Sequence, residues 1–375
     1  MISRRRHICG TLAFGALLLA CSGSAAAHAQ QSMGKSLVVY SPPAVSAFLE
    51  ALAEPFAEHT RRKFGAPVHV DIVTMSAPVA WATLETEWPT PSGDVYIFYE
   101  TNVREGIRKG YFRQIRPAFT DREWGRFDSE AMRAIDTGGY AAPLLLTSLV
   151  LAVQESLAEN AVTGWADLSG ETLRKRFTLE SALSVGAGYN VVAAAALVEG
   201  SDWRDWFRNG RFDEAAARPA LERVRQWADN ALTMTRGSGT IRPLLARQEA
   251  LASTWWWANT VQEIRNGMKL RVVYPEEGTI TAFQAGPVVT SVTKNPAGAM
   301  EWVKFVHSDV AGAIANRINY LGRIPLSGEE WTPEWKSYMA KAKRVPIDEF
   351  RALVFDPAYN MAFIDAYSRI VLEGR

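Results

Sequence analysis

Short apolar runs alternate with amphipathic stretches from Ser36 onward, and this alternation restricts the chain to few folds. Residues 37–40 predict a strand, the apolar residues that follow recur at helical spacing up to Phe56, and further strands are predicted at 68–73 and 95–99. Strand, helix and strand in repetition are typical of a doubly wound unit. We therefore predict an α/β fold with a mainly parallel sheet flanked by helices.

The first 29 residues are typical of a secretory signal peptide. Three arginines at 4–6 precede an apolar stretch at 8–20, and small residues at 25–29 offer a cleavage site, so the mature chain is expected to begin near Gln30. The apolar stretch is shorter than the roughly 20 residues that span a bilayer. Export by the general secretory route or by a twin-arginine route both stay open, as does a lipoprotein anchored through Cys21.

A second series of strands and helices begins where the chain leaves the first unit, near Pro143. The apolar run 148–153 is able to pass between domains, and later helices are predicted at 190–198 and 214–227. Without the leader about 345 residues remain, which is more than one hydrophobic core usually serves. Two domains are therefore expected.

Composition excludes several functions for the mature chain. Both cysteines lie in the leader, so disulfides, thiolate metal sites and a cysteine nucleophile are not expected. Of 41 basic residues the leader holds three, which leaves 38 against 40 acidic residues, and this balance argues against a nucleic-acid partner. His59, His69 and His307 are scattered without ligand spacing. We expect no metal and no cofactor.

Catalytic motifs are also absent from the sequence. There is no G-x-S-x-G elbow, and no G-x-G-x-x-G follows a predicted strand. Residues 34–36 end like a phosphate-binding loop, but the glycine required earlier in that motif is replaced by Ala29. The chain is therefore not expected to be an enzyme, although an exported enzyme of another kind stays open as an alternative.

An ordered set of segments resembles the spermidine/putrescine-binding proteins and related receptors of ABC importers. The main matches are residues 270–278, 294–299 and 320–325. Further matches are Gly93–Tyr96, Gly110–Phe112, Trp165–Leu168 and Tyr367–Arg375.

This resemblance implies the type II fold of periplasmic binding proteins, with two α/β lobes, two hinge crossings and a ligand between the lobes. The lobes are then expected to comprise residues 30–146 plus 284–324, and residues 147–283 plus 325–375. The implied function is capture of a small organic solute, foremost a polyamine-like amine, and its delivery to a membrane permease. The implied protein is a periplasmic monomer.

Other ligands and partners stay open at this point. An anionic or zwitterionic solute, such as a phosphonate or an amino acid derivative, is one alternative, and ferric iron is another. A ligand-sensing partner of a sensor kinase is a third.

The aromatic candidates for ligand contact lie in a run of three tryptophans. By position Trp256 matches a tryptophan that stacks on the ligand in the polyamine-binding family, and Trp257 is a second candidate. If the run is a strand, Trp255 and Trp257 share one face and Trp256 takes the other. Packing within a lobe is the alternative role for all three.

Polar candidates lie near predicted strand ends. Gln284 falls near the aspartate that pairs with the ligand amine in the polyamine-binding family, which puts that specificity in question, and Phe283 beside it would supply an apolar wall. Ser41, Ser76 and the pair Tyr99 and Glu100 follow strands of the first unit, where a binding loop is expected. A turn or a solvated surface is the alternative role for these residues.

A small-residue loop precedes the alanine-rich helix. Its backbone N–H groups at 184–190 suit a carboxylate or a phosphonate, with Ser184 and Tyr189 as side-chain candidates. Iron receptors of related type carry adjacent tyrosines, whereas Tyr189 stands alone, which makes iron a minor option.

Overall fold

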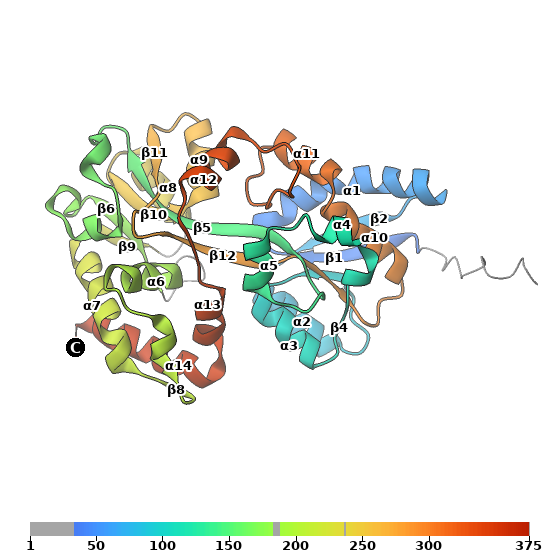
Figure 1. The fold of residues 1–375 in the computed structure, drawn as a ribbon, viewed down its shortest axis with the longest axis horizontal. Coiled ribbons are helices and arrows are strands. Elements are labelled where there is room, and N and C mark those ends of the chain that lie inside the picture. The colour runs from blue at the N-terminus through green and yellow to red at the C-terminus, as the bar shows by residue number, and fades with distance from the viewer. Residues whose placement is uncertain (1–33, 183–187, 236–237, 375) are drawn as a thin grey trace, which may run out of the picture.

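The computed structural model describes residues 34–182, 188–235 and 238–374. They form two α/β lobes side by side, joined by long strands that run between them (Figure 1). The expected leader, the expected mature start at Gln30 and Cys21 lie outside the described residues. Within those residues, no helix is both long and apolar enough to cross a membrane.

Lobe 1 is built on a five-stranded sheet with the strand order β2-β1-β3-β13-β4. Its strands are β1 (Ser36–Ser41), β2 (His69–Thr74), β3 (Val95–Ile97), β4 (Phe112–Arg113) and β13 (Pro287–Thr290). β1 pairs in parallel with β2 and β3, whereas β13 pairs antiparallel with β3 and β4. Its helices are α1 (Pro43–Phe64), α2 (Ala77–Glu87), α3 (Glu100–Arg108), α4 (Asp121–Trp124), α5 (Ser129–Ile135), α10 (Pro296–Val306) and α11 (Asp309–Arg317).

The sheet of lobe 1 is covered on both faces, as a doubly wound unit requires. Leu37 and Val39 point to one face, where they pack with α1, α10 and α11. Tyr40, the next residue, belongs to the opposite face, where it packs with α2 and α3. The alternation of side chains along β1 therefore decides which helix covers which face.

Lobe 2 is built on a larger mixed sheet with the order β14-β12-β5-β10-β6-β9, and β11 pairs with β5. Its strands are β5 (Pro143–Gln154), β6 (Phe177–Glu180), β9 (Thr233–Thr235), β10 (Ala252–Trp256), β11 (Leu270–Val273), β12 (Thr279–Ala285) and β14 (Arg344–Pro346). Its helices are α6 (Gly188–Val198), α7 (Glu214–Asn230), α8 (Ser238–Ala246), α9 (Trp257–Arg265), α12 (Pro333–Lys341), α13 (Asp348–Phe355) and α14 (Pro357–Tyr367).

Short elements complete the chain. β7 (Phe207–Arg208) and β8 (Arg211–Phe212) form a hairpin. Single helical turns are η1 (Arg116–Ala118), η2 (Glu159–Ala161), η3 (Trp165–Ser169), η4 (Glu171–Leu173) and η5 (Trp203–Trp206), and the π-helical η6 (Ser368–Glu373) ends the described chain.

The two crossings expected from the sequence lie next to each other. The chain enters lobe 2 through β5 and returns from β12 to β13, and β5 and β12 pair antiparallel between the lobes (Figure 1). At the point of return, the backbone N–H of Gly286 donates to the carbonyl oxygen of Ala142 at 2.5 Å. The residue-level lobe boundaries stay a prediction, since two of them fall inside these strands.

A third passage between the lobes follows α11. It is tied to β5 by two backbone bonds, from Leu146 N to Gly322 O and from Ile324 N to Leu144 O, each of 2.9 Å. The passage leads into α12, β14 and α13 of lobe 2. Its consequence is that the C-terminal segment returns to the junction between the lobes.

Candidate functional site

Helix α13 occupies the junction between the two lobes. It contacts β12 within its own lobe and reaches α3 and α5 of lobe 1, and it lies between the lobes in Figure 1. Glu100 of α3 lies close to Asp348 and Arg351 of α13 there, and the buried Gln284 of β12 follows Phe283, whose backbone N–H bonds to Asp348. We call this group, Glu100, Gln284, Asp348 and Arg351, the junction cluster.

Glu100 is the first residue of α3 and its side chain is completely buried. Neither carboxylate oxygen has a hydrogen-bond partner in the part of the chain that the structure describes. Burial raises the pKa of Glu100, and the positive charges of Arg351 and Arg104 oppose that rise. A buried carboxylate without donors is costly, so this position requires an explanation.

Asp348 is the first residue of α13, a helix of lobe 2. Its Oδ1 accepts a 2.8 Å hydrogen bond from the backbone N–H of Phe283, while its Oδ2 is buried and has no partner among the described residues. Burial, and then the nearby charge of Glu100, raise the pKa of Asp348 to about 7, against the attraction of Arg351. The two acids are therefore close enough to influence each other.

Arg351 lies one helical turn further along α13 and is 9% exposed. Its guanidinium carbon is 4.6 Å from the centre of the Tyr99 ring, a cation–π arrangement between the lobes. Glu100 and Asp348 attract its charge, but the side chain forms no hydrogen bond or salt bridge within the described residues.

Gln284 follows Phe283 on β12. Its side chain is buried, and its Oε1 has no hydrogen-bond partner in the described chain. The Phe283 ring packs in the apolar core, so only its backbone N–H takes part in the cluster. The junction cluster thus presents four unpaired acceptor oxygens, on Glu100, Asp348 and Gln284.

Ser41 and Ser76 lie at the carboxyl ends of β1 and β2. Ser41 is buried, and its hydroxyl donates to the carbonyl of Pro42 and accepts from Ser46, which in turn accepts from Thr74 at 2.8 Å. Ser76 is exposed before α2 and makes no capping bond. Both belong to the same sheet edge as Tyr99 and Glu100, as predicted from the strand ends.

The tryptophan run is divided between a strand and a helix. β10 ends at Trp256 and Trp257 begins α9, so the prediction that Trp255 and Trp257 share one face of a strand is wrong. Trp257 is buried, donates from Nε1 to the Tyr274 hydroxyl at 3.2 Å, and packs on Tyr338 at 4.7 Å between ring centres. Trp256 is half-buried at the start of α9. These positions favour a packing role for Trp257 and leave Trp256 as the aromatic candidate.

The loop before α6 contributes less than the sequence allowed. Ser184 lies outside the described residues. Tyr189 is 9% exposed and packs edge-on against Phe355, and burial raises its pKa. In the same first turn, the Nδ2 of Asn190 is buried without a partner among the described residues.

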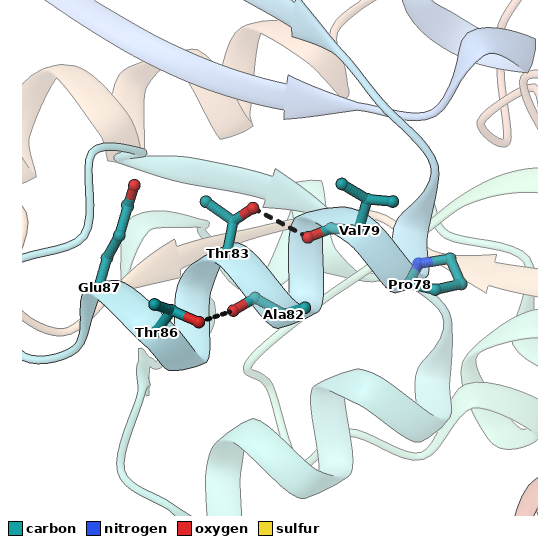
Figure 2. A pocket seen from close by; sticks show the side chains of 6 residues that line it. All are labelled: Pro78, Val79, Ala82, Thr83, Thr86 and Glu87. Atoms are coloured by element: carbon teal, nitrogen blue, oxygen red, sulfur yellow. Dashed lines mark hydrogen bonds between the residues drawn. The ribbon is translucent and has the colours of Figure 1, made fainter.

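Two surface depressions lie away from the junction. One follows the exposed side of α2, where Thr83 and Thr86 already donate to carbonyls of the same helix (Figure 2). Its lining residues are Pro78, Val79, Ala82, Thr83, Thr86 and Glu87. The other lies beside Arg116 and Gly139. Neither contains a buried unpaired charge, so we place the candidate site at the junction cluster instead. Within the described ranges, no group of histidine, cysteine and acidic residues has the arrangement of a metal site.

Of the residues proposed from the sequence, Tyr99 and Glu100 lie near Arg351, and Phe283 and Gln284 of β12 lie beside Asp348, whereas Asp348 and Arg351 themselves were not among the candidates. The sequence of α13 contains a pattern that marks Arg351 as unusual. Buried apolar residues at 347, 350 and 354 mark the inner stripe of α13, and Arg351 interrupts that stripe with a charge.

The two lobes, the crossings and the polar junction define a two-lobed binding protein. The model of the bacterial extracellular solute-binding protein family matches residues 51–343. The chain belongs to this family, which confirms the resemblance seen in the sequence at the level of solute-binding proteins.

Solved structures share the fold at low sequence identity. An ABC transporter structure from Clostridium perfringens is 17% identical, covers 89% of this chain and 99% of its own, and has a TM-score of 0.68. The spermidine/putrescine ABC transporter substrate-binding protein PotD of Streptococcus pneumoniae is 13% identical over 91% of this chain and 98% of its own, with a TM-score of 0.64. The Atu4243-GABA receptor is 18% identical over 88% and 96%, with a TM-score of 0.66. Among curated protein sequences nothing matches significantly.

Proposed function

We propose that this chain is the periplasmic receptor of an ABC importer, and that it captures a small organic amine at the junction cluster for delivery to a membrane permease. The chain acts as a monomer and performs no catalysis. The single observation that carries the amine is the Glu100 carboxylate, which is completely buried and has no hydrogen-bond donor among the described residues.

An ammonium group complements this arrangement. It carries up to three N–H donors and a positive charge, and the cluster offers four unpaired acceptor oxygens, three of which belong to the carboxyl groups of Glu100 and Asp348. Hydrogen bonds to charged groups contribute about 1.5 to 3 kcal/mol each, and a buried unsatisfied acceptor costs about 1 to 3 kcal/mol. A bound amine would therefore remove a penalty and add favourable contacts at once.

Another residue of the junction cluster supplies the negative charge that Gln284 lacks. Gln284 occupies the neighbourhood of the aspartate in the polyamine-binding family, and an amide cannot supply a negative charge. Asp348, held against the backbone of Phe283, brings a carboxylate to the same place from another element. This supports an amine ligand, and the polyamine-like class is the first to test because of the family resemblance.

The proposed lobes are residues 30–146 plus 284–324 and residues 147–283 plus 325–375, which close on the ligand by hinge motion. Glu100 belongs to the first lobe, and Asp348 and Arg351 to the second. A ligand held by all three would link the lobes, because each lobe supplies part of the site.

Isothermal titration of the mature protein with putrescine, spermidine and amino acids tests the proposal. We expect saturable binding of at least one amine, and a loss of affinity of tenfold or more in Glu100→Gln. Glu105→Gln is the matched control, because Glu105 lies on the same helix in a partly exposed pair with Arg108. Binding of amines that is equal in wild type and Glu100→Gln would refute the assignment of the site.

A further inference from the structure

We infer that the ligand is a zwitterion, whose ammonium group is received by Glu100 and Asp348 and whose carboxylate is received by Arg351. This inference rests on the proposed function and narrows its class of amine to amino acids and their close derivatives. Arg351 then determines specificity, because it separates amino acids from polyamines.

The first argument is the state of Arg351 itself. A guanidinium has five N–H donors, and this one is nine-tenths buried without any hydrogen bond or salt bridge in the described chain. Glu100, whose charge attracts Arg351, also lacks hydrogen bonds within the described residues. A ligand that carries both kinds of partner would satisfy this donor group and this acceptor group together.

Another buried arginine of the same chain provides the comparison. Arg323 is 4% exposed, and its two terminal nitrogens donate to both carboxylate oxygens of Glu329 at 2.7 and 2.8 Å. It also donates to the carbonyl oxygen of Ser308. Where a buried guanidinium serves packing in this protein, its hydrogen bonds are satisfied internally. Arg351, which lies at the junction between the lobes, does not follow this pattern.

Charge balance gives the second argument. The junction already holds two positive side chains near Glu100, namely Arg351 and Arg104. A diamine or a longer polyamine would add two or more positive charges to a buried region that has two carboxyl groups. Burial of uncompensated charge is costly, whereas a zwitterion adds no net charge.

Geometry of recognition agrees with a carboxylate. The planar guanidinium fork matches a carboxylate through two parallel hydrogen bonds, and the Tyr99 ring, whose centre is 4.6 Å from the guanidinium carbon of Arg351, supports the charge without using any of its N–H donors. Arg104 is less suited, because its terminal nitrogen donates to the carbonyl of Ile135 at 3.1 Å.

Matched ligand pairs of equal chain length test the inference by isothermal titration. One pair is putrescine and 4-aminobutanoate, and the other is cadaverine and 5-aminopentanoate. The α-amino acids alanine, glutamine and lysine are titrated in the same way. Butanoate and succinate serve as probes that have a carboxylate but no amine. We expect an amino acid to bind at least tenfold more tightly than any diamine. Diamines that bind as tightly as or more tightly than every amino acid would overturn the inference and leave the proposed amine receptor standing. Binding of butanoate or succinate alone, or silence of every probe, would overturn both.

Variants of Arg351 give a second readout that a merely structural residue would not move. In Arg351→Gln, the ratio of amino acid to diamine affinity is expected to fall at least tenfold, whereas Arg351→Lys keeps the charge and the order of preference. Arg242→Gln, which changes an exposed arginine paired with Glu263 in the same lobe, is the control and should leave the ratio unchanged. An unaltered ratio in a folded Arg351→Gln protein contradicts the inference. If that variant does not fold, Arg351→Lys and the wild-type pairs still decide.

Discussion

The guanidinium of Arg351 lies over the ring of Tyr99, 4.6 Å from its centre, so a charge of lobe 2 rests on an aromatic side chain of lobe 1. The two residues are brought together by the third passage of the chain between the lobes, which carries α13 back to α3. The junction cluster therefore belongs to neither lobe alone. Changes at this contact should affect ligand binding and lobe closure together.

Binding of an amine should depend on pH through Asp348, because burial and the nearby charge of Glu100 raise its pKa to about 7, against the attraction of Arg351. An ammonium ion needs the ionised carboxylate, so affinity should rise by up to about tenfold per unit of pH below about pH 7 and level off above it. Stability of the unliganded protein should change in the opposite direction. Because the folded state raises the pKa from 3.8 to about 7, it holds the proton more tightly, and this contribution falls as the pH rises through that range.

Titrations and urea unfolding from pH 5 to 8 measure both slopes. Asp348→Asn should flatten them, whereas Asp229→Asn, at an exposed position of the same lobe, should not. An unchanged pH dependence in Asp348→Asn would assign the titration to another group.

Alanine variants of Trp256 and Trp257 should distinguish a ligand-binding role from a packing role. Trp257→Ala empties a space against Trp335 and Tyr338 and should lower the free energy of unfolding by about 3 to 5 kcal/mol. Trp256→Ala should weaken an amine ligand by about 0.5 to 2 kcal/mol through loss of a cation–π contact, with the smaller effect on unfolding. Urea denaturation and calorimetry on both variants check this, and the reverse order of effects would exchange the two roles.

Gly286 should not tolerate a side chain. A Cβ at this position would lie 2.4 Å from the carbonyl oxygen of Ala142, on the other crossing between the lobes. Gly286→Ala should therefore lower the free energy of unfolding by about 1 to 3 kcal/mol. Gly239→Ala is the matched control, because a Cβ there meets open space in α8 and should be neutral or stabilising by up to about 1 kcal/mol. Equal unfolding midpoints for the two variants would show that the backbone of the crossings accommodates the added methyl group without loss of stability.

Arg344 should help hold the lobes together. It is the first residue of β14 in lobe 2, and it pairs in lobe 1 with Asp128, the N-cap of α5, at 3.3 Å and with Glu130 of α5 at 2.6 Å. Arg344→Gln should cost about 0.5 to 1 kcal/mol of this contact and increase the radius of gyration of the unliganded protein in small-angle scattering. Arg174→Gln, which removes an exposed pair within lobe 2, is the control. A radius that is unchanged in Arg344→Gln would exclude this pair from lobe closure.

Local patterns account for the success of the sequence at the first unit. The continuous apolar run at 37–40 and the helical spacing of apolar residues up to Phe56 are properties of neighbouring residues, and the structure forms β1 and α1 there. The same reasoning failed at Trp257, because the change from strand to helix within the tryptophan run leaves no local signal.

By itself, the sequence determined the α/β class, the strand ends that place Ser41, Ser76 and Glu100 on one sheet edge, and the family of solute-binding proteins. Only the tertiary structure decided that Glu100 meets Asp348 and Arg351, which lie about 250 residues further along the chain. The physical reason is that strand and helix patterns arise from neighbouring residues. Burial and the attraction between charges depend instead on distances in space, and here the third passage between the lobes sets them.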